Sequence, residues 1–291
     1  MKCDICIRPA KPHSISCYRC FGIVNATKFY RHPRRLCLDA SYDELLDRFR
    51  CCITNIPMID DDPLSPYYVH CCQRIPSQPL DRMAVCAFIS MFKSDLSDTE
   101  LVTVIPHLDD HFARGIPFNK DIIPFRYWRR SAPPPPKEAL LWGMPPPGTA
   151  KKCAICIRLA LPRSKYCPRC RKIIFPKPNW VQTAAGMKEY YDPEADGFRC
   201  AYTDILLNDC DIFDPWYMVM DHVVPGQKKV VPAAFWVNDM KGCMTAAGFK
   251  KAIAESANHI RTGEPFDTGV ITRDDWKRSL IYMRLVGRRI A

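Results

Sequence analysis

The sequence predicts an α+β protein built from two tandem copies of one module, joined by a proline-rich linker. Three observations support this fold class. A four-cysteine pattern occurs twice, the segments that follow it match one another, and prolines gather between the two copies. Fixed-offset self-similarity of this kind is the mark of a duplicated module. We place the copies at residues 1–131 and 151–291, with the linker at residues 132–150.

The match between the copies continues well beyond the cysteines. Phe49-Arg50-Cys51 recurs as Phe198-Arg199-Cys200, and two small deletions align the remaining positions. Other matched pairs are Lys93 with Lys241, His111 with His259, Phe118 with Phe266, and Trp128 with Trp276. Between the copies, residues 133–136 and 145–147 are proline runs, which favour an extended, semi-rigid spacer.

Each copy opens with the pattern C-x2-C-x10-C-x2-C. Two such pairs present four thiolates at the corners of a tetrahedron, which is the geometry that Zn²⁺ prefers. A thioredoxin-like redox pair would instead need one C-x-x-C beside a βαβ pattern. We therefore predict two closed structural zinc sites, which contribute folding energy rather than catalysis. The predicted ligands are Cys3, Cys6, Cys17 and Cys20 in the first copy, and Cys153, Cys156, Cys167 and Cys170 in the second.

Bulk composition narrows the class of partner. The chain has 17 cysteines, an odd number, and no apolar stretch of the kind that begins an exported chain, so we expect a reducing, cytoplasmic or nucleoid-associated location. No run of about 18 apolar residues occurs, so we expect no membrane span. The formal charge of +11 favours a polyanion, and nucleic acid is the commonest such partner.

Chemically capable side chains gather in the second copy at the end of a predicted strand, residues 216–222. Pro225-Gly226 is a turn signal, and residues 228–231 are expected to form a return strand. Pro232 fits the first position of a helix that continues to Lys241. Thr245 is expected to cap a second helix with Phe249, Ile253 and Ile260 on one face, and residues 97–100 predict a capping box in the first copy.

Asp221-His222-Val-Val-Pro225 with Asn238-Asp-Met-Lys241 resembles the ββα-metal site of HNH endonucleases, over about residues 200–245. The resemblance implies that His222 is the general base and that Asp221 and Asn238 bind Mg²⁺ or Mn²⁺. It also implies that Lys241 holds a phosphate. Asp239 remains an alternative metal ligand. The family pattern often ends in a further histidine, whereas His259 lies beyond an expected helix break and receives no role.

The first copy lacks most of this set. Cys72 stands where the second copy has Asp221, Gln73 where it has His222, and Ser90 where it has Asn238. Only Lys93 is retained. His70 lies two residues before Cys72, about 7 Å along the strand, which is too far to replace the missing base. We expect the first copy to be catalytically inactive.

The leading hypothesis is a DNA endonuclease or nickase with one active site. A single site cuts one strand per binding event, so a double-strand cut would require a homodimer or two events. Lys228 and Lys229 would contact phosphates, although paired lysines are commonly solvated surface charges. The alternative is a non-catalytic, zinc-dependent nucleic-acid-binding or assembly scaffold, in which Asp221 and His222 are merely a hydrogen-bonded pair. RNA is a weaker ligand candidate, because no RNP-type or GXXG motif occurs.

Overall fold

The chain forms helices and pairs of short antiparallel strands, which confirms the α+β class. A computed structural model describes residues 3, 6–12, 20, 41–74, 82–123, 151–161, 164–174, 180–211 and 214–277. Its contacts divide the chain into two compact units, residues 1–115 with 239–291 (unit 1) and residues 116–238 (unit 2). Unit 1 therefore contains segments of both sequence copies. The predicted linker lies outside the described residues, so its boundaries stay a prediction.

The first hairpin of unit 1 pairs β1 (Tyr42–Asp43) with β2 (Arg48–Phe49). Asp43 shapes the turn, because its Oδ1 accepts hydrogen bonds from the backbone N–H groups of Leu45 and Leu46 at 3.0 and 3.2 Å. Aspartate favours turns for this reason, since its short side chain satisfies nearby backbone donors. The hairpin is therefore determined locally.

A second strand pair in unit 1 leads directly into a helix. β3 (Val69–Gln73) pairs antiparallel with β4 (Arg82–Cys86), and α3 (Ala87–Lys93) follows β4 without a loop. The described side chains of β4 and most of those of α3 are buried. This strand–strand–helix element forms the core of unit 1.

Helix α4 (Asp98–Arg114) begins at the predicted capping box. The Ser97 side chain accepts from the Glu100 N–H at 3.3 Å, and the Glu100 carboxylate accepts from the Ser97 N–H at 2.6 Å. The helix ends at Gly115, whose φ of 66° is the left-handed conformation that closes a helix C-terminus. The start of α4 was thus predicted from the sequence, and Gly115 marks its end.

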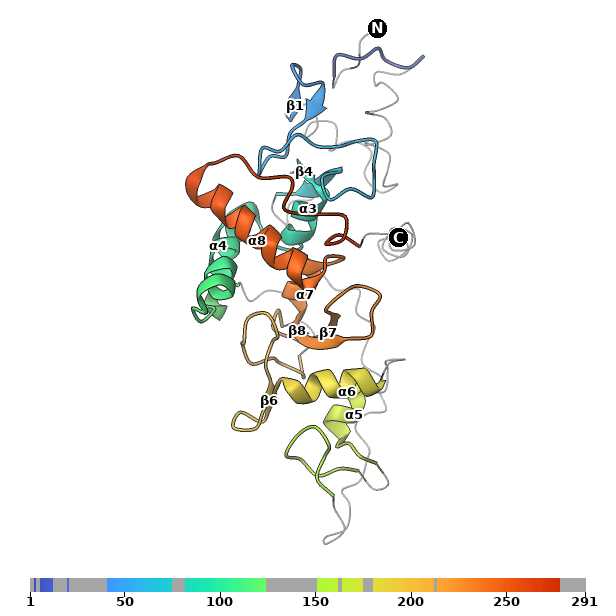
Figure 1. The fold of residues 1–291 in the computed structure, drawn as a ribbon, viewed down its shortest axis with the longest axis vertical. Helices are drawn as coiled ribbons and strands as arrows, with labels where there is room; N and C mark the ends of the chain where they lie inside the picture. Colours follow the sequence, from blue (N-terminus) through green and yellow to red (C-terminus); the bar gives the residue numbers. More distant parts are fainter. Residues whose placement is uncertain are drawn as a thin grey trace. The chain divides into compact units, whose positions relative to one another are not determined.

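Helix α8 (Ala246–Thr262) packs along α4 in unit 1, as Figure 1 shows. The Thr245 side chain caps it by accepting from a backbone N–H of the first turn at 2.9 Å, as predicted. Of the predicted apolar face, Phe249 and Ile253 are fully buried and Ile260 is half-buried. Since α4 and α8 occupy matched places in the two copies, their pairing joins one copy to the other.

The segment after α8, residues 264–277, continues across the first copy within unit 1. The Phe266 ring lies 5.4 Å from the Phe88 ring, measured between centroids. The Trp276 indole N–H donates to the Leu64 carbonyl at 2.8 Å. The second copy therefore covers the strand–strand–helix element of the first.

Unit 2 holds most elements of the second copy. They are α5 (Pro168–Ile174), α6 (Trp180–Glu189), β5 (Tyr191–Asp192) with β6 (Gly197–Phe198), and β7 (Met218–His222) with β8 (Val230–Ala234). The unit also contains η1 (Lys120–Ile122) from the first copy. Helix α7 (Phe235–Lys241) follows β8 and contains the division between the units. Helix α6 lies against β8. The two approach so closely at Gly186 that an added Cβ would lie 2.1 Å from the Val230 carbonyl oxygen.

The exchange of segments is reciprocal. Within unit 2, the Phe118 ring lies 6.1 Å from Trp216 and 5.6 Å from Trp236. Phe118 follows α4 in the first copy, just as Phe266 follows α8 in the second. Trp236 matches Phe88 in sequence. Each copy thus contributes its tail to the core of the other.

One element differs from its prediction. Pro232 lies inside β8 opposite Met220, and the helix begins three residues later at Phe235. The Pro232 carbonyl accepts from the Ala201 N–H at 2.9 Å, so the proline backbone faces away from β7. The missing N–H of proline therefore costs no hydrogen bond of the strand pair.

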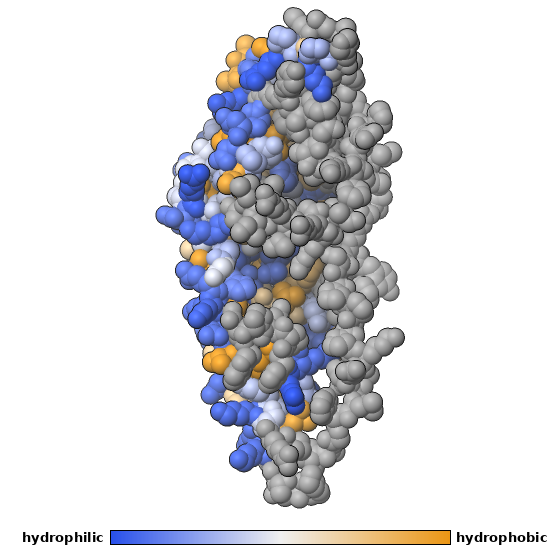
Figure 2. All heavy atoms as spheres, turned by 90° about the vertical axis from the view of Figure 1, so that its right-hand side faces the viewer, coloured by the Kyte–Doolittle hydropathy of each residue, from blue (hydrophilic) through white to orange (hydrophobic). Residues whose placement is uncertain are grey.

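The described surface is mainly hydrophilic on the face shown in Figure 2, with small separate hydrophobic areas. Among the exposed apolar side chains, Leu45 stands at the turn of the first hairpin and is 97% exposed. No helix in the described part of the chain is long and apolar enough to cross a membrane.

Candidate functional site

Four cysteines of the second copy meet in unit 2. Their sulfur atoms all lie within 4.8 Å of one another, and all four residues are buried. Cys153 and Cys156 lie in a tight turn in which the Cys153 N–H donates to the Arg158 carbonyl at 2.8 Å. Cys167 immediately precedes α5, and Cys170 lies in its first turn. Two short local structures therefore bring four thiols to one point.

The cluster fits a tetrahedral metal ion. The Cys156 sulfur lies 3.5 Å from that of Cys167 and 3.6 Å from that of Cys170. A disulfide would need about 2.05 Å, whereas four thiolates around Zn²⁺ at about 2.3 Å are separated by about 3.8 Å. A hydrogen bond from Cys170 lowers the pKa of the Cys167 thiol, whereas the same hydrogen bond and burial raise the pKa of Cys170. This cluster can hold a metal ion such as zinc.

The first copy forms a matching cluster in unit 1. Cys3, Cys6 and Cys20 are buried together, and the sulfur atoms of Cys6 and Cys20 are 3.6 Å apart. Cys17, the fourth predicted ligand, lies outside the described residues. The three described thiols can hold a metal ion.

Further contacts join each four-cysteine segment, here called a knuckle, to the hairpin beside it. In unit 2, Arg158 pairs with Asp196 at 2.9 Å, and the Tyr191 hydroxyl donates to the same carboxylate at 2.7 Å. In unit 1, Arg8 pairs with Asp47 at 2.8 Å and Tyr42 donates to it at 2.6 Å. Matched residues thus make matched contacts in the two halves. The same arginine–aspartate and tyrosine–aspartate contacts therefore support both knuckles.

The other predicted residues lie at the end of β7 in unit 2. Asp221 is buried, with 4% of its surface exposed, whereas the neighbouring His222 is exposed. Successive side chains of a strand point to opposite faces, which accounts for the contrast. Asp221 lies opposite Val231 and His222 opposite Val230 in the strand pair. One residue thus faces the protein interior and the other the solvent.

Asp221 is held by a residue that the sequence patterns did not single out. The Tyr202 hydroxyl donates a hydrogen bond to Asp221 Oδ2, and the tyrosine is itself buried. Burial, the negative charge of Asp221 and this hydrogen bond all raise the pKa of Tyr202 well above its usual range. The phenol therefore stays protonated and remains a donor. Comparison of the copies offered a signal for this residue, because Ile53 occupies the matched position.

The structure separates the predicted lysines by environment. Lys228 and Lys229 are exposed in the turn between β7 and β8. Lys241 is fully buried at the end of α7. Its predicted contact with phosphate therefore gains no support from its placement. Asn238, on the same helix, is half-buried.

Asp239, the alternative metal ligand, is exposed and accepts a hydrogen bond from the Ser94 hydroxyl at 2.5 Å. His259, left without a role, lies within α8, and its Nδ1 is 2.6 Å from the Glu264 carbonyl oxygen. Helix α7 ends before α8 begins, so the expected helix break is present. Neither residue lies on the strand that carries Asp221.

The chain matches no family model, no curated protein and no solved structure. The case for a function therefore depends on the chemistry of the residues themselves.

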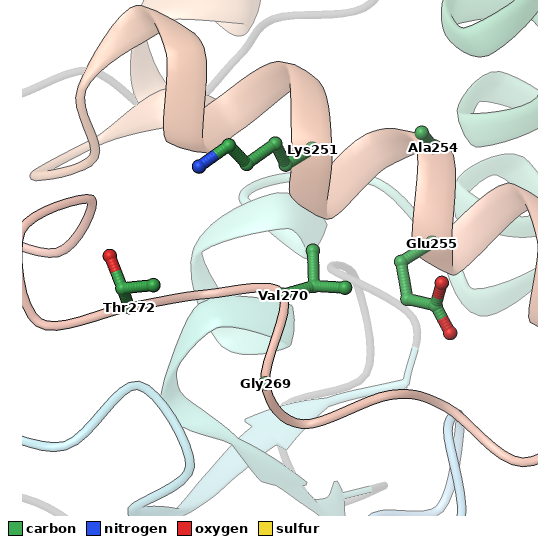
Figure 3. A pocket seen from close by; sticks show the side chains of 6 residues that line it. All are labelled: Lys251, Ala254, Glu255, Gly269, Val270 and Thr272. Carbon is green, nitrogen blue, oxygen red and sulfur yellow. The ribbon is translucent and has the colours of Figure 1, made fainter.

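An open hollow of about 490 Å³ lies elsewhere, in unit 1, between α8 and the loop that follows it (Figure 3). In the view of Figure 3, Lys251 extends from α8 to the left and Glu255 extends downward. Lys251 pairs with Asp275 at 3.1 Å, and Glu255 accepts from the Asp267 N–H at 2.7 Å. The charged groups of this hollow hold the loop in place, and they include none of the predicted site residues.

Proposed function

We propose that the protein is a metal-dependent DNA endonuclease or nickase of the HNH type, with one active site in the second copy. The observation that carries the proposal is the buried, hydrogen-bonded Asp221 beside the exposed His222, at the end of a strand pair that leads into a helix bearing Asn238. The first copy has the same strand–strand–helix element with Cys72 and Gln73 at the matched positions. It serves as an inactive partner.

The donor set fits a hard divalent cation. Asp221 supplies carboxylate oxygens and Asn238 an amide oxygen, and such oxygens are the ligands of Mg²⁺ and Mn²⁺. A buried carboxylate is costly unless its charge is compensated. Tyr202 supplies part of that compensation, and a cation would supply more. When bound, the cation stabilises negative charge on the phosphate and on the leaving oxygen.

His222 acts on the attacking water. Its exposed position lets a water molecule and a DNA strand reach the imidazole. Histidine is a common general base, and general base catalysis contributes about 10² to 10⁴-fold to rate. Lys228 and Lys229 hold the DNA backbone beside it.

The second candidate is a zinc-dependent nucleic-acid-binding or assembly scaffold without catalysis. The two buried cysteine clusters favour it, because they can hold metal ions without any part of the β7 site. For the first copy we favour this non-catalytic function, because Cys72 and Gln73 replace the aspartate and the histidine. The same experiment separates the two functions.

The test is nicking of supercoiled plasmid by zinc-loaded protein in Mg²⁺ or Mn²⁺. We expect relaxed circles that EDTA abolishes, and His222→Ala to lower the rate about 10² to 10⁴-fold. The matched control is Gln73→Ala, which alters the same strand position in the first copy and leaves the rate unchanged. An absence of cleavage on plasmid, single-stranded DNA and RNA would exclude general nuclease activity and favour the scaffold.

A further inference from the structure

Tyr202 lies in a turn that several backbone hydrogen bonds hold in place. It lies in a tight turn where the Cys200 N–H donates to the Ile205 carbonyl and the Asp204 N–H to the Cys200 carbonyl, both at 2.9 Å. The neighbouring Ala201 N–H donates to Pro232 on β8 at 2.9 Å. The turn is thereby attached to the strand that pairs with β7. The phenol reaches Asp221 from a rigid support.

The first copy keeps this turn but not the tyrosine. The Cys51 N–H donates to the Ile56 carbonyl and the Cys52 N–H to the Ala84 carbonyl on β4, again at 2.9 Å. These backbone bonds match those around Cys200. Ile53 replaces the tyrosine in the copy that also lacks the aspartate. The fold therefore forms without this hydroxyl–carboxylate pair, and the pair occurs only where the other candidate site residues occur.

We propose that Tyr202 is a positioning residue that holds the Asp221 carboxylate in the orientation that binds the divalent cation. The inference rests on the proposed function. An ionised carboxylate has about four acceptor positions, so accepting from Tyr202 is compatible with binding a cation. Partners that orient a metal ligand typically change metal affinity or activity by about 10 to 100-fold when they are removed.

The test measures Mn²⁺ binding by electron paramagnetic resonance on the zinc-loaded full-length chain, without substrate. We expect Tyr202→Phe to weaken Mn²⁺ binding about 10 to 100-fold, and the Mg²⁺ concentration for half-maximal nicking to rise by a similar factor. At saturating Mg²⁺ the nicking rate recovers most of its wild-type value. Tyr202→Ile, which introduces the residue of the first copy, is expected to weaken binding at least as much.

The matched control is Tyr191→Phe, which removes another tyrosine–aspartate hydrogen bond of unit 2, to Asp196 beside the knuckle. It should leave Mn²⁺ affinity unchanged. Folded, zinc-loaded Tyr202→Phe and Tyr202→Ile proteins with wild-type Mn²⁺ affinity would overturn the inference. Failure of the proposed function gives a different result, because the wild-type protein would then bind Mn²⁺ no better than Asp221→Asn does.

Discussion

Lys93 and Lys241 occupy matched positions in the two copies, and both are buried. Lys93 is 2% exposed, and its ammonium group lies 2.6 Å from the carbonyl oxygens of Arg74 and Leu96 and 2.9 Å from the Asp98 carboxylate. These contacts tie the end of α3 to the start of α4. Lys241 occupies the matched position and is also fully buried. We therefore assign Lys241 to the stability of the fold, and the proposed phosphate contact then falls to Lys228 and Lys229.

At the residue scale, Lys241→Met should lower the free energy of unfolding by about 2–4 kcal/mol, because it removes a fully buried ammonium group from its contacts. It should leave the salt dependence of DNA binding unchanged.

Lys228→Ala with Lys229→Ala should instead preserve stability and reduce the slope of log affinity against log salt by about 1.8. Urea unfolding and DNA titrations at several salt concentrations measure both quantities. A Lys241→Met protein of normal stability with weakened DNA binding would contradict the assignment.

At the scale of the element, a tight turn and the start of α5 form the cysteine cluster of the second copy. Ile157 and Leu159 of the second knuckle are 56% and 53% exposed. Ile155, Ala160, Leu161 and Tyr166 are buried. The core of so short an element is nevertheless small, and a bound metal ion would add to its stability. The contacts of Arg158 and Tyr191 to Asp196 then transmit the order of the knuckle to the adjoining hairpin.

Cys167→Ser should therefore reduce the zinc content by one ion per chain and lower the midpoint of thermal unfolding. The serine hydroxyl cannot replace a thiolate as a zinc ligand at neutral pH. Cys210→Ser is the control, since Cys210 is exposed and belongs to neither cluster. Zinc is counted by mass spectrometry of the metal, alongside calorimetry. Equal zinc content in the wild-type and Cys167→Ser proteins would show that this cluster does not bind the ion.

At the scale of the whole molecule, the reciprocal exchange makes each core depend on both copies. Unit 1 joins α4 to α8 through Phe249, whose ring centroid lies 5.7 Å from that of Phe92 and 6.0 Å from that of Phe112. Arg261 of α8 adds an ion pair to Asp109 of α4 at 2.6 Å. We therefore expect this shared core to persist when the covalent connection between the copies is cut.

A protease site inserted between residues 131 and 151 tests whether the shared core holds the two copies together. After cleavage, we expect the two fragments to elute as one 1:1 complex in gel filtration and to retain Mg²⁺-dependent nicking. The reason is that both halves of the buried α4–α8 contact remain present. Phe249→Ala, expected to cost about 3–5 kcal/mol as a large-to-small core change, should make the cleaved fragments separate more readily. Fragments that separate at once without that substitution would show that the shared core is weak.

Several features follow from the sequence because they depend on residues close along the chain. The cysteine spacing predicted both clusters, although Cys17 lies outside the described residues. Ser97 and Thr245 predicted two helix starts, since a capping side chain bonds to the turn beside it. The end of β7 at Asp221 and His222 was likewise predicted from local alternation and turn signals.

The sequence by itself determined the class of the fold, the thiol clusters and the strand that carries Asp221 and His222. Only the tertiary structure decided that Lys241 is buried, that Pro232 belongs to a strand and that Tyr202 holds Asp221. It alone revealed that Phe118 and Phe266 exchange between the copies. The physical reason is that caps, turns and metal-ligand spacings are short-range, whereas burial and side-chain partnership depend on which distant segments pack together.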